Sequence, residues 1–324
     1  MIEPDQRVLP ELRPLLGAAP DIDTSILAVT ELRSMADAGV IAVGAAVRTP
    51  AAPPEVSDHS VPVAGGDIAV RVYRPVDAPA IDAPAHIHLH GGGWWMGSLE
   101  TADAGCRDLA AESGWVVVSV GYRLAPEHPY PAPLDDVLAA IDWVAGRGRE
   151  LGIDVAALTI GGESAGANLA AASCLALRDR GGVRIAAQWL DVPALDLSLQ
   201  TGRGSLLEFG AGYGLDRTGI ETCIGYYTTP EQRGEALVSP MVADLAGLPP
   251  AVISVAECDP IRDQGEEYAR RLGLADVPVR LRRWPGHLHS TMWLTELSPT
   301  ARDCQRWAID SLDELRAAVR MTAA

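Results

Sequence analysis

Residues 160–166 read Ile-Gly-Gly-Glu-Ser-Ala-Gly, which places Ser164 at the centre of a Gly-x-Ser-x-Gly pattern. A hydrophobic run over 157–160 precedes the pattern, and an alanine-rich stretch with helical character, 165–177, follows it. Glycines on either side of a serine allow a sharp strand-to-helix turn that exposes the hydroxyl. The helix N-terminus then directs N–H groups and a positive dipole end toward it. This context predicts a nucleophilic serine, although the pattern alone also occurs in ordinary Gly/Ser loops.

A second glycine-rich loop, His-Gly-Gly-Gly over 90–93, follows the apolar stretch 85–89. Consecutive glycines let backbone N–H groups approach a ligand, and in acyl transfer such donors stabilise the developing oxyanion by about 3–4 kcal/mol each. The alternative is a flexible loop, but Trp94 and Trp95 come next and would anchor the loop by packing. The pattern therefore predicts an oxyanion loop.

A serine nucleophile needs a base, normally a histidine that a carboxylate orients. Only His287 and His289 follow Ser164 in the chain, and both lie in the loop 285–290, directly after the predicted strand 279–284. Chain order thus reduces the seven histidines to two candidates for the base.

The acid is expected between the serine and the histidine in the chain. Asp259 follows the buried-strand pattern 251–256, and Pro260 biases it away from helical conformation. A helix N-cap is the other interpretation of an Asp before Pro. Asp263 lies one turn later and is expected on the following helix.

These motifs resemble those of the bacterial hormone-sensitive-lipase-like esterases, also called family IV carboxylesterases. The resemblance runs from about Val70 to about Glu314, and its most specific part is Tyr-Arg-Leu-Ala-Pro-Glu-His-Pro over 122–129. The other segments that carry it are His-Leu-His-Gly-Gly-Gly-Trp over 88–94, Gly-Glu-Ser-Ala-Gly over 162–166, Ser239-Pro240 and Asp-Pro-Ile-Arg-Asp over 259–263.

The resemblance implies residue roles at the matching positions. Ser164 corresponds to the nucleophile and Asp259 to the acid, and the backbone N–H groups of Gly92, Gly93 and Ala165 correspond to the oxyanion hole.

The family's histidine loop usually reads Gly-x-x-His-Gly-Phe, and residues 286–289 match its first four positions. This makes His289 the base and leaves His287 as the alternative. Ser290 and Thr291 stand where the family has Gly-Phe, which changes the pocket wall, and Glu163 is a variant of the family's Asp.

Strand and helix patterns alternate along the chain, which predicts a mostly parallel central sheet with helices on both faces. The resemblance implies that this sheet belongs to an α/β-hydrolase fold. Predicted strands are 68–73, 85–90, 115–121, 157–161, 185–190, 251–256 and 279–284, and predicted helices are 5–17, 24–39, 102–113, 134–147, 165–180, 262–272 and 300–319. The proline-rich stretch 122–136 is expected to be a rigid structural loop, with His128 buried and hydrogen-bonded.

Residues 198–238 interrupt this alternation. In the resembling family such an insertion, together with the N-terminal helices, forms a helical cap over the active site; the alternative is an ordinary surface insertion. The expected organisation is cap helices in 1–50, a catalytic core in 51–197 and 239–324, and a cap insertion in 198–238. The candidate pocket walls are Trp94, Trp95, Phe209 and Tyr213.

Composition excludes several function classes. All 26 basic residues other than histidine are arginine, so a Ser-x-x-Lys hydrolase, a pyridoxal phosphate Schiff base and a Walker A loop are excluded. The net charge of −17 disfavours nucleic-acid and anionic-membrane partners. His86, His88 and His90 alternate along a predicted strand, but no further ligand is spaced to join them, so no metal or other cofactor is expected.

Five cysteines without a pairing pattern indicate free thiols in a reducing compartment. The N-terminus shows no signal-peptide pattern, and no apolar run reaches membrane-span length, so a cytoplasmic location is expected.

The sequence therefore predicts a serine carboxylesterase that acts on small, short-chain acyl esters through a Ser-His-Asp triad and an acyl-enzyme. Two alternatives stay open. One is a hydrolase of another acyl bond (amide, lactone, thioester, acetylated sugar or drug). The other is a non-catalytic binding protein on the same fold, like the plant gibberellin receptors, which lose the histidine that this chain retains. The resemblance also implies a homodimer formed through the strand 279–284.

Overall fold

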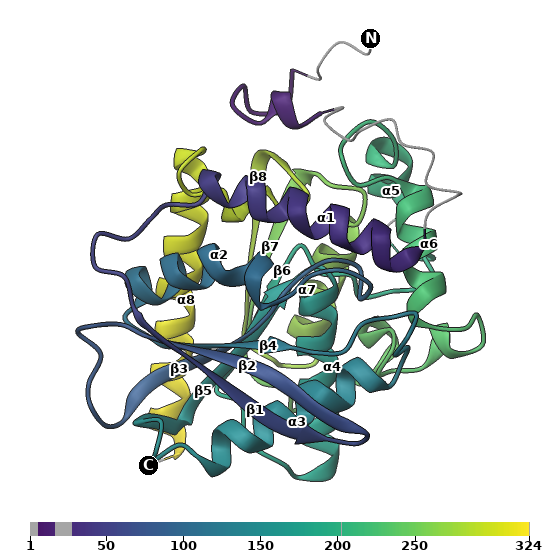
Figure 1. Ribbon diagram of the computed structural model, residues 1–324. Coiled ribbons are helices and arrows are strands. Elements are labelled where there is room, and N and C mark those ends of the chain that lie inside the picture. The colour runs from purple at the N-terminus through teal and green to yellow at the C-terminus, as the bar shows by residue number, and fades with distance from the viewer. Residues whose placement is uncertain (1–5, 17–27, 202, 324) are drawn as a thin grey trace.

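The computed structural model describes residues 6–16, 28–201 and 203–323, with side chains up to 318. In this part of the chain eight strands form one sheet with the order β1-β2-β4-β3-β5-β6-β7-β8 (Figure 1). β2 runs antiparallel to β1 and β4, and all other neighbours are parallel, as predicted. The strands are β1 Glu55–Val63, β2 Gly66–Arg74, β3 Ala83–Leu89, β4 Val116–Gly121, β5 Ile153–Glu163, β6 Ala187–Asp191, β7 Ala251–Cys258 and β8 Val279–Leu288.

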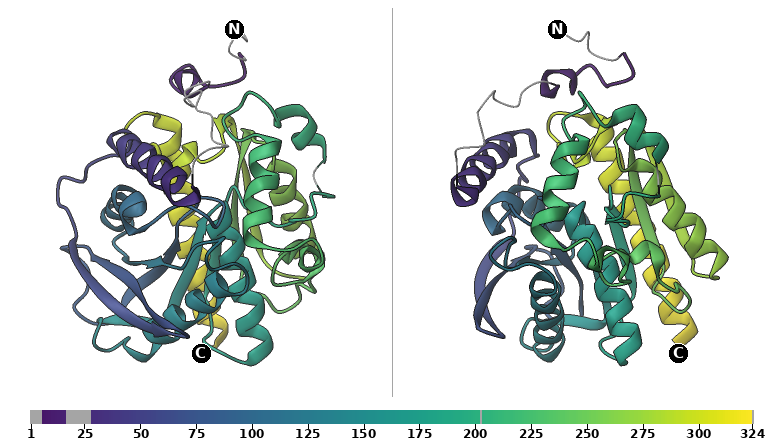
Figure 2. Two further views of the ribbon diagram at one scale, coloured as in Figure 1. Left: turned by 45° about the vertical axis from the view of Figure 1, so that its right-hand side comes forward. Right: turned by 90° about the vertical axis from the view of Figure 1, so that its right-hand side faces the viewer.

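Helices cover both faces of the sheet (Figure 2). α2 (Leu99–Ser113) and α8 (Pro299–Ala323) pack on one face, and α3 (Ala132–Gly146), α4 (Ala165–Arg180) and α7 (Arg262–Leu274) pack on the other. The strands in the middle of the sheet are buried on both sides and therefore read as apolar runs rather than as alternating patterns.

Three more helices lie at the end of the molecule opposite the C-terminus (Figures 1 and 2). α1 (Val29–Val43) comes from the N-terminal part of the chain, and α5 (Arg203–Phe209) and α6 (Arg217–Tyr227) come from the segment between β6 and β7. No residue of α1 is buried, so it contributes little to the core.

One predicted helix is wrong, one strand was missed, and one predicted helix has different bounds. The predicted helix over 5–17 is wrong in its described part, 6–16, which contains only a 3₁₀ turn, Arg13–Leu15. Pro10 and Pro14 lack the N–H groups that a helix there would need. Strand β1 was not predicted, because it is an edge strand with a single buried residue, Val61, and carries no hydrophobic signal. Of the predicted helix 24–39, residues 24–27 lie outside the described part, and α1 continues to Val43.

Candidate active site

Ser164 sits on the sharp turn between β5 and α4, with φ 55° and ψ −111°. This conformation is rare for a residue with a side chain and is held by its surroundings. The Ser164 N–H donates to the carbonyl of Asp191 at 2.9 Å. A Cβ at Gly162 or Gly166 would come within 2.2 or 2.1 Å of the Leu89 carbonyl oxygen, so the turn requires glycine at both places.

His289 and Asp259 form a hydrogen-bonded pair, with 2.8 Å between His289 Nδ1 and Asp259 Oδ2. Asp259 is fully buried, and its other oxygen accepts the N–H of Ile261 at 2.9 Å, which fixes the carboxylate. Burial by itself would lower the pKa of His289, but the charge and hydrogen bond of Asp259 raise it above its ordinary value. His289 and Ser164 line the same pocket.

The alternative base, His287, does not line this pocket. Its ring nitrogens pair with the hydroxyls of Thr291 at 3.0 Å and Thr300 at 2.8 Å. Burial lowers the pKa of His287 to about 4, so the ring is neutral near pH 7. These contacts indicate that His287 stabilises the histidine loop. Asp263 lies on α7, as expected.

The two departures from the family's histidine loop make hydrogen bonds. The Ser290 hydroxyl donates to Glu163 Oε1 at 2.6 Å, which joins the histidine loop to the residue before the serine. The Thr291 hydroxyl accepts the N–H of Leu288 at 3.1 Å. Burial raises the pKa of Glu163. Both Ser290 and Thr291 also line the pocket, which agrees with the expectation that they alter its wall.

The loop 90–97, called the oxyanion loop after its predicted role, passes beside the serine turn. Its glycines 91–93 line the pocket together with Ser164. The His90 ring stacks on Tyr122 with 4.2 Å between ring centroids, and the Tyr122 hydroxyl donates to the His90 carbonyl at 2.8 Å. Trp94 is buried and stacks on Tyr227 of α6, with 4.6 Å between centroids. The tryptophans therefore anchor the loop, as the sequence indicated.

The pocket above Ser164 has a volume of about 620 Å³ and a mostly apolar lining. α1 contributes Ala36, Gly39 and Val40, and α6 contributes Ile220 and Ile224. Of the four predicted wall residues, Trp94 and Trp95 line the pocket.

Phe209 and Tyr213 do not belong to the lining of this pocket, contrary to expectation. They meet edge to face at 5.0 Å between centroids and pack with Val8, Leu12 and Leu288. The two rings thus pack against the N-terminal segment instead of lining the pocket.

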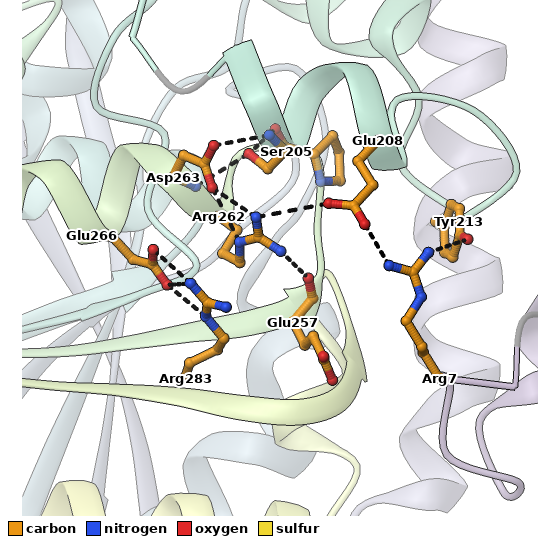
Figure 3. Close-up of polar contacts among 10 residues, drawn as sticks. Arg7, Ser205, Glu208, Tyr213, Glu257, Arg262, Asp263, Glu266 and Arg283 are labelled. Atoms are coloured by element: carbon orange, nitrogen blue, oxygen red, sulfur yellow. Dashed lines mark hydrogen bonds and ion pairs between the residues drawn. The ribbon is translucent and has the colours of Figure 1, made fainter.

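A polar network braces the loop that carries Asp259 (Figure 3). Arg262 donates to the Glu257 carbonyl at 2.9 Å and lies 4.0 Å from the carboxylate of Glu208 on α5. Ser205, also on α5, donates its hydroxyl to the Pro260 carbonyl at 2.9 Å and its N–H to Asp263 at 2.9 Å. Helix α5 is therefore attached to the residues that follow the acid, and Arg262 joins them to Glu257, two positions before it.

Two buried polar residues near the site were not predicted to belong to it. They are Asp191 and His88, and His88 lines the pocket. Asp191 ends β6, and burial raises the pKa of its carboxyl well above the ordinary value. His88 meets Trp293 edge to face at 5.1 Å, and burial lowers the pKa of His88 to about 3. Asp191 stands in no motif, and His88 begins the segment 88–94 that carries the family resemblance, but that resemblance assigns it no role.

Two further expectations concern other histidines. His128 is exposed, not buried as predicted, because residues 126–129 face outward, with Glu127 bound to Arg33. Within the described residues no group of three His, Cys, Asp or Glu side chains could hold a metal ion.

Comparison with known proteins identifies the family of this chain. Residues 86–293 match the alpha/beta hydrolase fold family. The carboxylesterase NlhH of Mycobacterium tuberculosis is 37% identical over 305 residues, which cover 88% of this chain and 93% of the relative. The chain belongs to the hormone-sensitive-lipase-like carboxylesterases.

Other relatives of this carboxylesterase agree. An ethyl acetate hydrolase of Pseudomonas putida is 36% identical over 266 residues, covering 80% of this chain and 82% of the relative. The hyperthermophilic esterase of Pyrobaculum calidifontis superposes with a TM-score of 0.89 at 35% identity, covering 96% of this chain and 99% of that one. Among the described helices, none has the length and apolar character needed to cross a bilayer.

Proposed function

We propose that this carboxylesterase hydrolyses small, short-chain acyl esters through a triad of Ser164, His289 and Asp259 and an acyl-enzyme intermediate. The observation that carries the proposal is the His289–Asp259 hydrogen bond of 2.8 Å beside a pocket that both Ser164 and His289 line. The apolar lining suits an uncharged acyl or alcohol group. The names of the relatives, carboxylesterase and ethyl acetate hydrolase, support the same substrate class.

The proposed reaction has two stages. The Ser164 hydroxyl attacks the ester carbonyl carbon while His289 accepts its proton, and the oxyanion receives the N–H groups of Gly92, Gly93 and Ala165. His289 then returns the proton to the departing alcohol, which leaves an acyl-serine. Water activated by His289 attacks the acyl group, and the carboxylic acid and free serine result. Asp259 remains ionised and holds the imidazole ring in position throughout.

We propose that residues 1–50 and 198–238 act as a cap on the core formed by 51–197 and 239–324. In the described part, α1 and α6 both supply pocket wall, which supports this division. β8 is the outer strand at one end of the sheet and offers its edge for the expected homodimer. The location proposed is the cytoplasm, which suits five cysteines that form no disulfide within the described residues.

A chain-length series tests the substrate class. We expect the highest kcat/KM for p-nitrophenyl acetate or butyrate, a lower value for the octanoate and the lowest for the palmitate, because a pocket of about 620 Å³ is closed over by α1 and α6. Steady-state rates at saturating and limiting ester measure this. A folded protein that hydrolyses none of these esters and is not labelled at Ser164 by a fluorophosphonate would contradict the proposal.

The pH dependence tests the role of Asp259. His289 must be neutral to accept a proton, so activity falls as the pH drops through its pKa. Because Asp259 raises that pKa, we expect the acid limb of kcat/KM in the wild type to lie at higher pH than for an ordinary histidine. Asp259→Asn should lower kcat about 10⁴-fold and move the limb to lower pH. Asp276→Asn, at an exposed position, is the control, and an unmoved limb in Asp259→Asn would count against the assignment.

Gly92→Ala tests the oxyanion loop. Gly92 has φ +110°, and a Cβ there would lie 2.3 Å from the Met96 carbonyl oxygen, so the loop must shift. We expect kcat to fall about 10²- to 10³-fold, the effect of losing one oxyanion donor. Gly114→Ala is the control, because Gly114 also has positive φ but lies in open space at the end of α2. Equal kcat in the two variants would show that the loop takes no part in catalysis.

A further inference from the structure

Helix α1 contacts the oxyanion loop through Arg33 and Asp37. The two residues are four positions apart, so their side chains project from the same side of the helix. The neighbouring stripe of Ala36, Gly39 and Val40 lines the pocket. Because no residue of α1 is buried, polar contacts contribute much of its attachment to the rest of the molecule.

Arg33 joins the oxyanion loop to the proline-rich loop beside it. Its Nε donates to the Trp95 carbonyl at 2.5 Å, and its Nη2 donates to the Ala125 carbonyl at 2.9 Å. The guanidinium also pairs with the carboxylate of Glu127 at 2.6 Å. The Ala125 N–H in turn donates to the Trp94 carbonyl at 2.9 Å. Only 18% of the Arg33 side chain is exposed, so water competes weakly for these contacts.

Asp37 holds the far end of the same loop. Its Oδ1 accepts the N–H of Gly97 at 2.8 Å. Gly97 lies directly on the His90 ring, since a Cβ at this position would come within 2.2 Å of His90 Nδ1. His90 is the first residue of the loop and Gly97 the last. The Asp37 contact therefore holds the two ends of the loop against each other.

The loop needs such outside support because its backbone is unfavourable in isolation. Gly92, Gly93, Trp94 and Gly97 all have positive φ, with values of 110°, 58°, 61° and 102°. Glycine pays an entropic cost when it is fixed, and tryptophan is rarely found in the left-handed region. Such conformations persist only where the surroundings over-determine them.

We propose that Arg33 and Asp37 are positioning residues that hold the N–H groups of Gly92 and Gly93 where they meet the oxyanion. The proposal rests on the proposed function, which assigns those N–H groups to the oxyanion hole. Helix α1 thereby acts on the chemical step, in addition to forming a wall of the pocket.

The test compares Arg33→Met and Asp37→Ala with the wild type on p-nitrophenyl butyrate. We expect kcat to fall about 10- to 100-fold in each, because a small displacement of catalytic groups has an effect of this size. KM should change little, because the pocket-lining residues of α1 are intact. Asp37→Asn retains an oxygen that accepts the Gly97 N–H and should recover most of kcat, and Arg33→Lys should lie between wild type and Arg33→Met.

Ser34→Ala is the matched control on the same helix. The Ser34 hydroxyl is exposed and donates to the Thr30 carbonyl of its own helix, and we expect this variant to keep the wild-type kcat. A readout independent of turnover is amide hydrogen exchange, which should speed up at Gly97 in Asp37→Ala and stay unchanged in Ser34→Ala. Affinity for a short-chain trifluoromethyl ketone, whose serine adduct carries an oxyanion, should fall in proportion to kcat/KM.

Two results would overturn the inference. One is an active wild type whose Arg33→Met and Asp37→Ala variants keep its kcat and exchange rates. The other is a rise in KM at unchanged kcat, which would make α1 a pocket wall alone. Failure of the proposed function would look different, because the wild type itself would then hydrolyse no ester.

Discussion

Ser164→Ala is expected to lower kcat for p-nitrophenyl butyrate about 10⁶-fold, since removal of the nucleophile leaves only binding and oxyanion stabilisation. KM should change far less, because the hydroxyl is a small part of a mostly apolar pocket. The fold should survive, because the substitution removes one oxygen while the turn stays fixed by Gly162, Gly166 and the Ser164 N–H bond to Asp191. Steady-state kinetics and a melting curve measure the two effects.

A fluorophosphonate probe adds a covalent test of the same residue. It should label the wild type on the peptide that contains Ser164, and it should not label Ser164→Ala. Ser60→Ala, exposed on β1, is the control and should keep both activity and labelling. Ester hydrolysis that persists in Ser164→Ala within about tenfold of wild type would refute the nucleophile assignment.

His289→Ala is the second variant with a very large expected effect, about 10⁶-fold in kcat, because a serine hydroxyl without its base is a poor nucleophile. The double variant with Ser164→Ala should be no slower than either single one, since serine and histidine act as a unit. The same kinetic assay checks both expectations.

His287→Asn separates the two histidines of the loop. His287 pairs with Thr291 and Thr300 and does not itself line the pocket, so its loss should appear in the free energy of unfolding, by about 1–3 kcal/mol, with kcat nearly unchanged. Chemical denaturation beside the kinetic assay distinguishes the outcomes. If His287→Asn were as inactive as His289→Ala, the kinetic data would no longer distinguish the two histidines as the base.

The parts of the site that the sequence predicts well are those built from neighbouring residues. The turn at Ser164 follows from its flanking glycines, the strand before it and the helix after it, and each of these leaves a local pattern. The buried strands β4 and β7 are continuous apolar runs. The edge strand β1 has no such run. In the N-terminal segment the apolar residues have the spacing of a helix, but its prolines prevent a helix from forming.

The contacts that complete the site depend on partners far apart in the chain. Sequence order left His287 and His289 as alternatives until the family pattern favoured one, and the structure brings only His289, 30 residues from Asp259, into a bond with that carboxylate. Phe209 and Tyr213 are aromatic residues in the right segment, yet they pack against the N-terminal segment and do not line the pocket. Side-chain identity does not indicate which of two hydrophobic surfaces a ring will meet.

The alternating strands and helices, the position of Ser164 between them, and the order of the predicted serine, acid and histidine can all be read from the amino-acid sequence. These features rest on backbone preferences and hydrophobic periodicity, which act over a few residues. The attachment of α1 to the oxyanion loop through Arg33 and Asp37 is visible in the folded molecule alone, because these contacts span 62 and 60 residues. Such hydrogen bonds form when two surfaces meet, and no periodic pattern in either segment records them.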